Sequence, residues 1–446
     1  MVNVTRSLAE FVVNTKAGDV PDNVVHEAKR SLLHWIGCAI GGSHERSVDC
    51  AVAAIKPFCG PPQASALGRS ERLDVLHAAF INGVSTDILS FSDTHPETLI
   101  HPTGVIGPVL FALAETKRTS GRDLLHALIL GFEVASRVSL AIYPWHYNRG
   151  WHITGTAGAF GAAAAAGKLL GLDETRLTWA LGIAATEAAG LRGMFGSMCK
   201  SFHSGRAAEN GLLAAFLARE GFTSVEDGIG GPRCFAHVLG ESPDLDRVSR
   251  DLGESYEITR NTYKAFPCGV VIHPVIDACL RLRQAPGFSV SAIDAVKIRA
   301  NPLVIELTGR KAPMTTLEGK LSVYHCAAAA LIAGRLGEQE CKPEIITRAD
   351  IVALRSKVRV QVDQAIREDE AYVTLCMPDG RKLREHVEHA IGTAERPMSD
   401  AEIETKFKGL CEPYLPPATI QRLIDRCWGI TDVADAGSLA RLGSAG

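Results

Sequence analysis

The chain has 446 residues, of which 46% are hydrophobic and 22% are charged, and its formal net charge at pH 7 is −3. This composition is typical of a soluble globular protein, and the length favours two domains, one of which can be discontinuous. Because the charge is slightly negative and no run of five or more Lys or Arg residues occurs, we expect neither nucleic acid nor a membrane as a partner. We therefore expect the protein to act on a small molecule.

The N-terminal segment, MVNVTRSLAEFVVNTKAGDVPD, has no apolar stretch behind a basic start, and we identify no later run of about 18 uncharged apolar residues. We therefore expect a cytoplasmic protein. The twelve cysteines contain no Cys-x-x-Cys pair, which predicts reduced thiols rather than disulfides or a Cys/His metal knuckle. Cys199 and Cys268 lie near lysines in the sequence, so each is a weaker candidate for a reactive thiolate.

The first part of the chain has the apolar spacing of helices, and we find no alternating strand pattern before Lys264. Helices are predicted within residues 8–42, with a second helix starting at Pro21-Asp22, and at residues 73–89, 105–117, 121–142, 174–190 and 205–220. The run ITGTAGAFGAAAAAGKLLGLD predicts a closely packed core helix that ends at Gly171 and has His152 at its head. Its first amides, at residues 154–156, suggest a seat for an anion.

After Pro267 the pattern changes to one of strands and helices. Alternation of polar and apolar residues predicts strands in SAIDAVKIRAN, KVRVQVD and AYVTLCMPDGRKLREHVEHA, with a hairpin turn at residues 377–380. Helices are predicted at residues 271–283 and 322–334, and again from Asp400 onward, while the end, DAGSLARLGSAG, predicts a loosely docked tail. The predicted fold class is mainly α, with a smaller α+β domain.

A polar segment interrupts the helices at residues 87–104, DILSFSDTHPETLIHPTG, where Pro96 and Pro102 exclude a continuous helix. Such a segment is either a solvated loop or an active-site loop. Polar and titratable side chains gather in it at Asp87, Ser90, Ser92, Asp93, Thr94, His95, Glu97 and His101. Further candidates stand in apolar surroundings at His152, Lys200, His203, Lys264 and His273. Their number and setting favour the active-site interpretation, although each alone is compatible with a structural role.

These residue types indicate proton transfer next to a carboxylate. Imidazole exchanges protons near neutral pH, and lysines without a phosphate-binding glycine loop most simply bind carboxylates and stabilise the enediolate-like charge that develops. The sequence has no motif of a nucleotide-binding loop, a zinc protease or a serine hydrolase. A metal site built from Asp93, His95, His101 and His152 is an alternative, but nearby ammonium groups would repel a dication.

Five ordered segments resemble the signature segments of the MmgE/PrpD family: FINGVSTDILSFSDTH…HPTGVIGPVLFALAE, GWHITGTAGAFGAAAAAGKLLGLD, MCKSFHSGRAAENGLLAAFLAREGFT, YKAFPCGVVIHPVIDA and LSVYHCAAAALIAG. This family includes 2-methylcitrate dehydratase, cis-aconitate decarboxylase and iminodisuccinate epimerase. The resemblance implies a helical domain built from residues 1–263 and 399–446, and an α+β lid at residues 264–398. It also implies a homodimer, a site between the domains, and no metal or organic cofactor.

Carried over by position, the family's site residues fall on Thr94, His101, His152, Lys200 and Lys264. The chain departs from the decarboxylase pattern at Ser90 and Ser92, where that pattern has aspartates, and Asp87 is a candidate replacement for the lost carboxylate. It departs again at His325, next to Tyr324, where the decarboxylase has a tyrosine. We predict catalytic roles for His101, His152, Asp93 and Thr94, and substrate binding by Lys200, Lys264, His203, His325 and Ser90.

Together, residues and resemblance predict a cofactor-independent lyase, a dehydratase or decarboxylase of a small di- or tricarboxylate. An epimerase or isomerase of a dicarboxylate such as iminodisuccinate is an alternative in the same site, with one histidine removing the α-proton and the other returning it. A third hypothesis, prompted by Ser90, Ser92 and His325, is a paralogue that binds carboxylates without catalysis.

Overall fold

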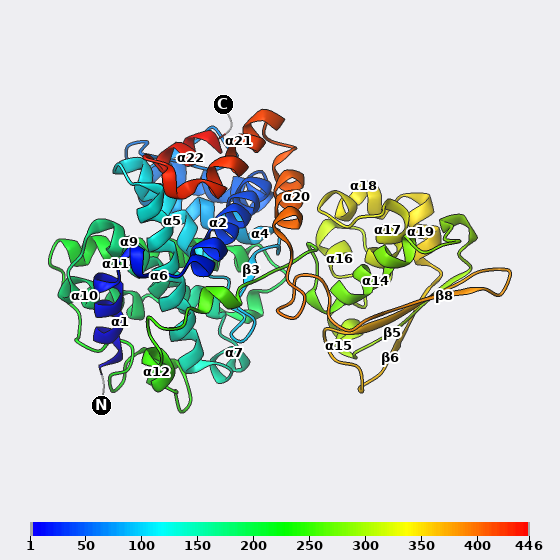
Figure 1. The fold of residues 1–446 in the computed structure, drawn as a ribbon, viewed down its shortest axis with the longest axis horizontal. Helices are drawn as coiled ribbons and strands as arrows, with labels where there is room; N and C mark the ends of the chain where they lie inside the picture. Colours follow the sequence, from blue (N-terminus) through cyan, green and yellow to red (C-terminus); the bar gives the residue numbers. More distant parts are fainter. Residues whose placement is uncertain (1–2, 445–446) are drawn as a thin grey trace. The chain divides into compact units, whose positions relative to one another are not determined.

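The computed structural model describes residues 3–444, which divide into two compact units (Figure 1). Both ends of the chain form unit 1, up to Thr262 and from Ser399, and residues 263–398 form unit 2. Unit 1 is built from helices, and unit 2 combines helices with a four-stranded sheet. The predicted fold class, mainly α with a smaller α+β part, is confirmed.

The long helices of unit 1 follow the predicted apolar periodicity. They are α1 (Val4–Asn14), α2 (Asp22–Gly42), α3 (Arg46–Ile55), α4 (Val75–Ile88), α5 (Thr103–Thr116), α6 (Gly121–Ile142), α9 (Gly158–Leu170), α10 (Glu174–Thr186), α11 (Cys199–Arg219), α20 (Asp400–Cys411) and α21 (Pro417–Trp428). Shorter elements are α7 (Trp145–Arg149), α8 (Ile153–Thr156), α12 (Phe235–Leu239), α13 (Asp246–Ser249), α22 (Gly437–Leu442) and the two-residue strands β1 (Ala64–Ser65), β2 (Arg72–Leu73) and β3 (Asp93–Thr94). A fourth short strand, β4 (Thr262–Tyr263), lies where the chain passes into unit 2.

Helix α11 crosses α4 and α9 at glycines. A Cβ added to Gly83 of α4 would lie 2.7 Å from the Cα of Gly205, and one added to Gly211 would lie 2.4 Å from the Cβ of Ala162 in α9. Only glycine permits backbones this close. The crossing brings the first turn of α11 beside the end of α4, where the polar loop begins.

Helix α6 is a long and largely buried helix of unit 1. By length and composition it could cross a membrane, although it is not a run of uncharged residues because it contains Glu133 and Arg137, and its apolar window is entirely buried inside the unit. It packs against α5 and α9 and carries the buried ion pair Glu133–Arg137, with Oε1 and Nε 2.6 Å apart. The structure therefore uses α6 as a core helix.

Unit 2 is organised around a sheet with strand order β6-β5-β7-β8. Its strands are β5 (Ala295–Ala300), β6 (Val358–Val362), β7 (Ala371–Cys376) and β8 (Lys382–Val387), and its helices are α14 (His273–Arg283), α15 (Leu303–Thr308), α16 (Thr316–Lys320), α17 (Val323–Ala333), α18 (Pro343–Ile346) and α19 (Ala349–Arg355). Strand β5 pairs with β6 in parallel and with β7 antiparallel, and β7 and β8 form the predicted hairpin. Figure 1 shows α14, α17 and α19 gathered on one side of the sheet.

The C-terminal end differs from the loosely docked tail that we predicted. Leu439 and Ala440 of α22 are buried, and a Cβ on Gly437 would lie 2.5 Å from the carbonyl oxygen of Ala114 in α5. The carbonyl oxygen of Gly443 accepts a hydrogen bond of 2.8 Å from the backbone N–H of Gly68. The prediction was wrong because docking depends on these tertiary contacts. The last two residues of the predicted tail, 445–446, lie outside the residues that the structure describes.

Candidate functional site

The polar loop joins α4 to α5 and is held in a strained conformation. Ser90 and Leu99 have φ angles of +56° and +62°, in the left-handed region that side chains with a Cβ disfavour. Such strain persists only where surrounding contacts impose it, and it is concentrated at functional sites. One such contact is the buried His95, whose Nε2 lies 2.8 Å from Oε2 of Glu257 and whose Nδ1 lies 2.9 Å from Oγ1 of Thr98. Both ring nitrogens of His95 are thus used to brace the loop.

His101, near the end of the loop, is fixed by its neighbours in one tautomer. Its Nδ1 donates a hydrogen bond of 2.6 Å to the carbonyl oxygen of Asp93 and lies 3.2 Å from Oγ1 of Thr94. Its backbone N–H donates to Oγ1 of Thr154 at 3.1 Å. Because a carbonyl oxygen only accepts, Nδ1 carries the proton and the lone pair of the neutral ring is on Nε2. This is the form in which an imidazole accepts a proton from a substrate.

Asp93 supports His101 through its backbone, while its carboxylate faces other partners. The carboxylate is fully buried, and Oδ2 accepts hydrogen bonds from Nδ2 of Asn261 at 3.0 Å and from the backbone N–H of Thr103 at 3.4 Å. Burial raises the pKa of Asp93 to about 6. These contacts give Asp93 a positioning role, and its predicted part in catalysis stays a prediction.

His152 lies next to His101 and is bonded to His203 of α11. The ring centroids of His101 and His152 are 6.4 Å apart, and Nδ1 of His152 lies 2.9 Å from Nδ1 of His203, so one of these two nitrogens donates and the other accepts. Two of the three amides of the anion seat predicted behind His152 are already used within the chain. The N–H groups of Gly155 and Thr156 both donate to the carbonyl oxygen of His152, because α8 is a single turn whose amides bond locally.

Burial and nearby cations keep His152 neutral. Burial lowers its pKa well below the ordinary value, the charge of Lys200 lowers it further, and the carboxylate of Asp87 opposes both. Burial also lowers the pKa of His203. The ring of Phe195 meets His152 edge-on with centroids 4.9 Å apart, and Phe195 itself is 39% exposed. Phe195 therefore separates His152 from solvent.

Lys200 stands in the first turn of α11 and forms an ion pair with Asp87 at the end of α4. The sequence placed Lys200 in a glycine-rich connector, but α11 begins one residue earlier, at Cys199. Its Nζ lies 2.7 Å from both carboxylate oxygens of Asp87, and the two side chains are 17% and 1% exposed. An ammonium group has three donors, so Asp87 takes two and orients the third. The oriented donor is suited to a substrate carboxylate.

The remaining predicted residues belong to unit 2. Lys264 is half-buried just after β4, and His273 is buried at the start of α14. His325 is buried in α17, where Nε2 donates to the carbonyl oxygen of Glu340 at 2.9 Å, and burial lowers its pKa. The structure thus gathers His101, His152, Lys200 and His203 in unit 1, together with Asp93 and Thr94. The roles of Lys264 and His325 stay predictions.

Sequence reasoning missed two residues of this cluster. Phe195 had a weak signal, an aromatic residue between Gly193 and Gly196 in a segment that carries a candidate lysine. Asn261 had none, because an isolated Asn has no spacing that indicates its partner. Its Nδ2 links Asp93 to Oγ of Ser31 at 3.0 Å, which only the fold determines.

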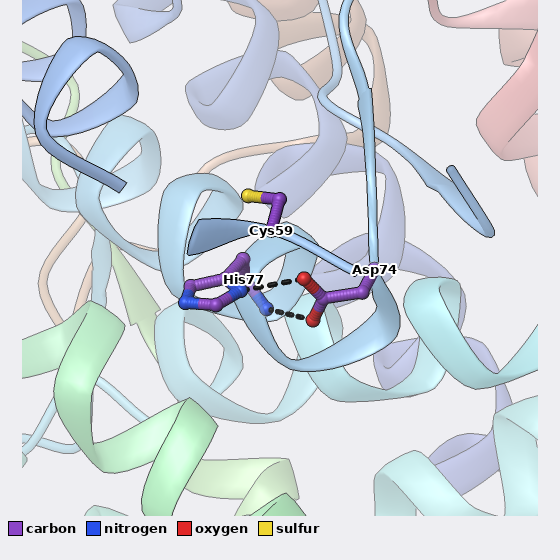
Figure 2. A group of neighbouring side chains, drawn as sticks. All are labelled: Cys59, Asp74 and His77. Carbon is purple, nitrogen blue, oxygen red and sulfur yellow. Dashed lines mark hydrogen bonds and ion pairs between the residues drawn. The ribbon is translucent and has the colours of Figure 1, made fainter. Parts of the chain in front are cut away.

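Two groups among residues 3–444 have side chains spaced to hold a metal ion, Cys59 with Asp74 and His77, and Asp369 with His389 and Glu395. Neither includes the four residues of the alternative metal site. Figure 2 shows Asp74 bonded to His77 beside the Cys59 sulfur. Oδ1 of Asp74 accepts from the N–H groups of Leu76 and His77 at 3.1 Å each, and Oδ2 accepts from Nδ1 of His77 at 2.6 Å and from the N–H of Gly60 at 3.0 Å. These four hydrogen bonds occupy the acceptor positions of the Asp74 carboxylate, so Asp74 acts as the N-terminal cap of α4.

Comparison with known proteins covers nearly the whole chain. The family model of the MmgE/PrpD N-terminal domain matches residues 6–248, and that of the MmgE/PrpD C-terminal domain matches residues 266–430. A cis-aconitate decarboxylase-like protein of Aspergillus oryzae is 29% identical over 468 residues, 99% of this chain and 97% of the relative. Cis-aconitate decarboxylases of Aspergillus terreus and Mus musculus are 28% and 27% identical, over 98% and 99% of this chain and 95% and 93% of the relatives.

Proposed function

Because the chain belongs to the MmgE/PrpD family, we propose that it is a cofactor-independent lyase that dehydrates or decarboxylates a small di- or tricarboxylate. The observation that carries the proposal is the pair of neighbouring imidazoles in unit 1, His101 and His152, beside an ammonium group oriented by Asp87. The family and the relatives support a lyase that acts on a carboxylate. The choice of a particular substrate goes beyond them.

In this proposal His101 moves the proton at the carbon next to a carboxylate. In a dehydration, Nε2 of His101 takes the α-proton, the bond from carbon to the neighbouring hydroxyl breaks, and the imidazolium gives the proton to the departing oxygen, so that water leaves. In a decarboxylation, the bond to the departing carboxylate breaks, the electron pair stays on carbon, and a protonated imidazole delivers a proton to it. Both routes place negative charge on a neighbouring carboxylate or on the carbon itself, and nearby cations stabilise that charge.

Lys200 binds a substrate carboxylate through the donor that Asp87 leaves available. We assign to Lys264 the binding of a second substrate carboxylate, because its position matches a site lysine of the family pattern. The substrate roles of Ser90, Thr94, His203 and His325 are likewise part of the proposal. A homodimer is expected as well, and light scattering on the purified protein checks it.

An epimerase is the second candidate, favoured by the two imidazoles themselves. His101 comes from the polar loop and His152 from the start of α8, and their rings are inclined at 67°. Two bases from different elements can address opposite faces of one carbon, so that one removes the α-proton and the other returns it.

The deciding experiment is an NMR assay in D2O with citrate, cis-aconitate, 2-methylcitrate and iminodisuccinate. Loss of water or carbon dioxide from any of them supports the lyase. Deuterium uptake at the α-carbon without such loss supports the epimerase. Saturable binding of these compounds without turnover or exchange would instead support the non-catalytic paralogue and overturn the proposal.

A further inference from the structure

Unit 2 contains a cavity of about 440 Å³ that no step of the proposed reaction uses. It is bordered by Tyr324 of α17, by Lys311 in the segment before α16, by Arg355 at the end of α19, and by Arg359 of β6, with Val352 and Val358 among the apolar contacts. A cavity of this volume accommodates a small molecule. None of these residues is among those predicted to contact the substrate.

The polar lining of this cavity is cationic. Lys311, Arg355 and Arg359 border it and no Asp or Glu does. Within residues 3–444, none of the three cations lies within 4.0 Å of a carboxylate oxygen. Arg359 donates to the carbonyl oxygens of Ser356 at 2.6 Å and of Val358 at 2.9 Å, and Arg355 donates to that of Ile346 at 3.2 Å. These carbonyl oxygens accept hydrogen bonds from individual N–H groups of the two arginines, but they do not neutralise the positive charges. The three cations therefore repel one another.

Neighbouring cations of unit 2 do have carboxylate partners. Arg310, adjacent to Lys311, lies 3.3 Å from Glu318. A second cavity of about 590 Å³ in the same unit is bordered by Arg335 and Arg348, and these pair with Glu340 at 2.8 Å and with Asp350 at 2.7 Å. Among the residues that the structure describes, two of the three cations that border the second cavity are thus paired with carboxylates, the exception being Lys342, whereas none of the three that border the first cavity is.

The position of Arg355 adds a second argument. Its side chain is partly buried, and this burial lowers the pKa of the guanidinium because water is removed and no carboxylate replaces it. An anion in the cavity would supply the missing counter-charge. Guanidinium groups bind phosphate and carboxylate oxygens in pairs, and the phenol of Tyr324 in the same lining can donate one more hydrogen bond.

We infer that this cavity binds a small oxyanion with two or more negative charges, either a phosphate compound or a polycarboxylate. Three cations, from the segment before α16, from α19 and from β6, border one concave surface, which suits an anion with several oxygen atoms. The inference does not rest on the proposed function, because it uses other residues and requires no turnover.

The test is isothermal titration calorimetry of the full chain with inorganic pyrophosphate. We expect saturable, salt-sensitive binding that weakens about tenfold for each cation removed, as expected for charge-assisted hydrogen bonds. The variants are K311Q/R359Q and Arg355→Gln, and the matched control is Arg348→Gln in the second cavity. Lys311 and Arg359 are exposed, so the double variant keeps the fold and decides the question even if Arg355→Gln unfolds.

Competition with citrate distinguishes the two sources of such an anion. If citrate displaces pyrophosphate in the wild type, the site accepts polycarboxylates, and if it does not, the site is specific for phosphates. Either outcome supports the inference provided that K311Q/R359Q weakens pyrophosphate binding. Absence of saturable binding, or equal affinities in K311Q/R359Q and Arg348→Gln, would overturn it.

Discussion

Two clusters of buried charge in unit 1 differ in their balance. The support network, Glu133, Arg137, Glu257 and His95, gives each carboxylate a hydrogen-bond partner on a basic side chain. Glu133 accepts from Nε of Arg137 at 2.6 Å and from the backbone N–H of Glu257 at 2.8 Å, and Glu257 faces His95 at 2.8 Å. The reactive cluster, defined here as His101, His152, His203, Lys200 and Asp87, gathers four groups that are cationic when protonated around one carboxylate.

The difference indicates what each cluster is for. A balanced network holds structure, since each removed partner would leave an unmatched buried charge. A cluster with an excess of potential cations attracts an anion, and burial lowers the pKa of His152 and of His203, which favours the neutral forms of these two imidazoles. Predictions that separate activity from stability test this contrast.

The largest effect is expected for His101→Ala. Removing a general acid–base group lowers kcat by about 10²–10⁴-fold. The folded state is expected to persist, because the support network is untouched. Turnover at saturating substrate, measured beside urea unfolding, checks both parts. A kcat within tenfold of the wild type would exclude His101 as the group that moves the proton.

The second prediction concerns the support network. Arg137→Met leaves the fully buried carboxylate of Glu133 without its partner, and we expect a loss of roughly 3–5 kcal/mol in the free energy of unfolding. The activity of the protein that remains folded is expected to change little. The control is R137M/E133Q, which removes the unmatched charge and is expected to recover part of the loss. An equal loss in both variants would contradict the electrostatic explanation.

A smaller effect on activity is expected for Asp87→Asn, which leaves the Lys200 ammonium without its carboxylate. We expect kcat to fall about tenfold, because an amide binds the ammonium less strongly and orients it less well. KM is expected to stay or to fall, since the uncompensated cation attracts the substrate carboxylate. Steady-state kinetics separate the two constants, and a rise in KM with unchanged kcat would contradict the orienting role.

The family pattern offers a rescue for the same variant. Ser90 stands where the decarboxylase pattern has an aspartate, and its φ of +56° is one that Asp adopts more readily than most residues. The variant D87N/S90D is expected to recover part of the lost kcat if Asp87 has replaced that carboxylate. No recovery in a folded double variant would show that the two positions are not equivalent.

Local patterns predicted most of the fold. Helix α6 has the predicted bounds, residues 121–142, and the β7–β8 hairpin forms at the predicted turn, because apolar periodicity and turn chemistry are local properties. The start of α11 at Cys199 was missed, since the preceding glycines and methionines weaken a helical pattern. The docking of α22 was missed because burial of Leu439 and Ala440 is a tertiary effect.

The sequence indicated which residues form the candidate site but not which of them contact one another. His101, His152 and Lys200 could be selected because titratable groups in apolar surroundings are unusual. That Asp87 is the partner of Lys200 could not be predicted, because the two are 113 residues apart and meet where α4 crosses α11 at Gly83 and Gly205. The sequence alone gives no sign of this crossing.

The smallest effect is expected for Asp93→Asn, seen in the pH dependence of stability. The ordinary pKa of 3.8 is raised by burial to about 6 in the folded chain. Between these values the folded state keeps a proton that the unfolded state has lost, so the stability contributed by the protonated group is fully present below 3.8 and is lost as the pH rises through 6. Asn cannot titrate, so the variant is expected to reduce this decline by at most about 1.4 kcal/mol per pH unit. Urea unfolding of both proteins at several pH values from 4 to 7 measures the slopes, and parallel slopes would show that Asp93 is ionised in the folded chain.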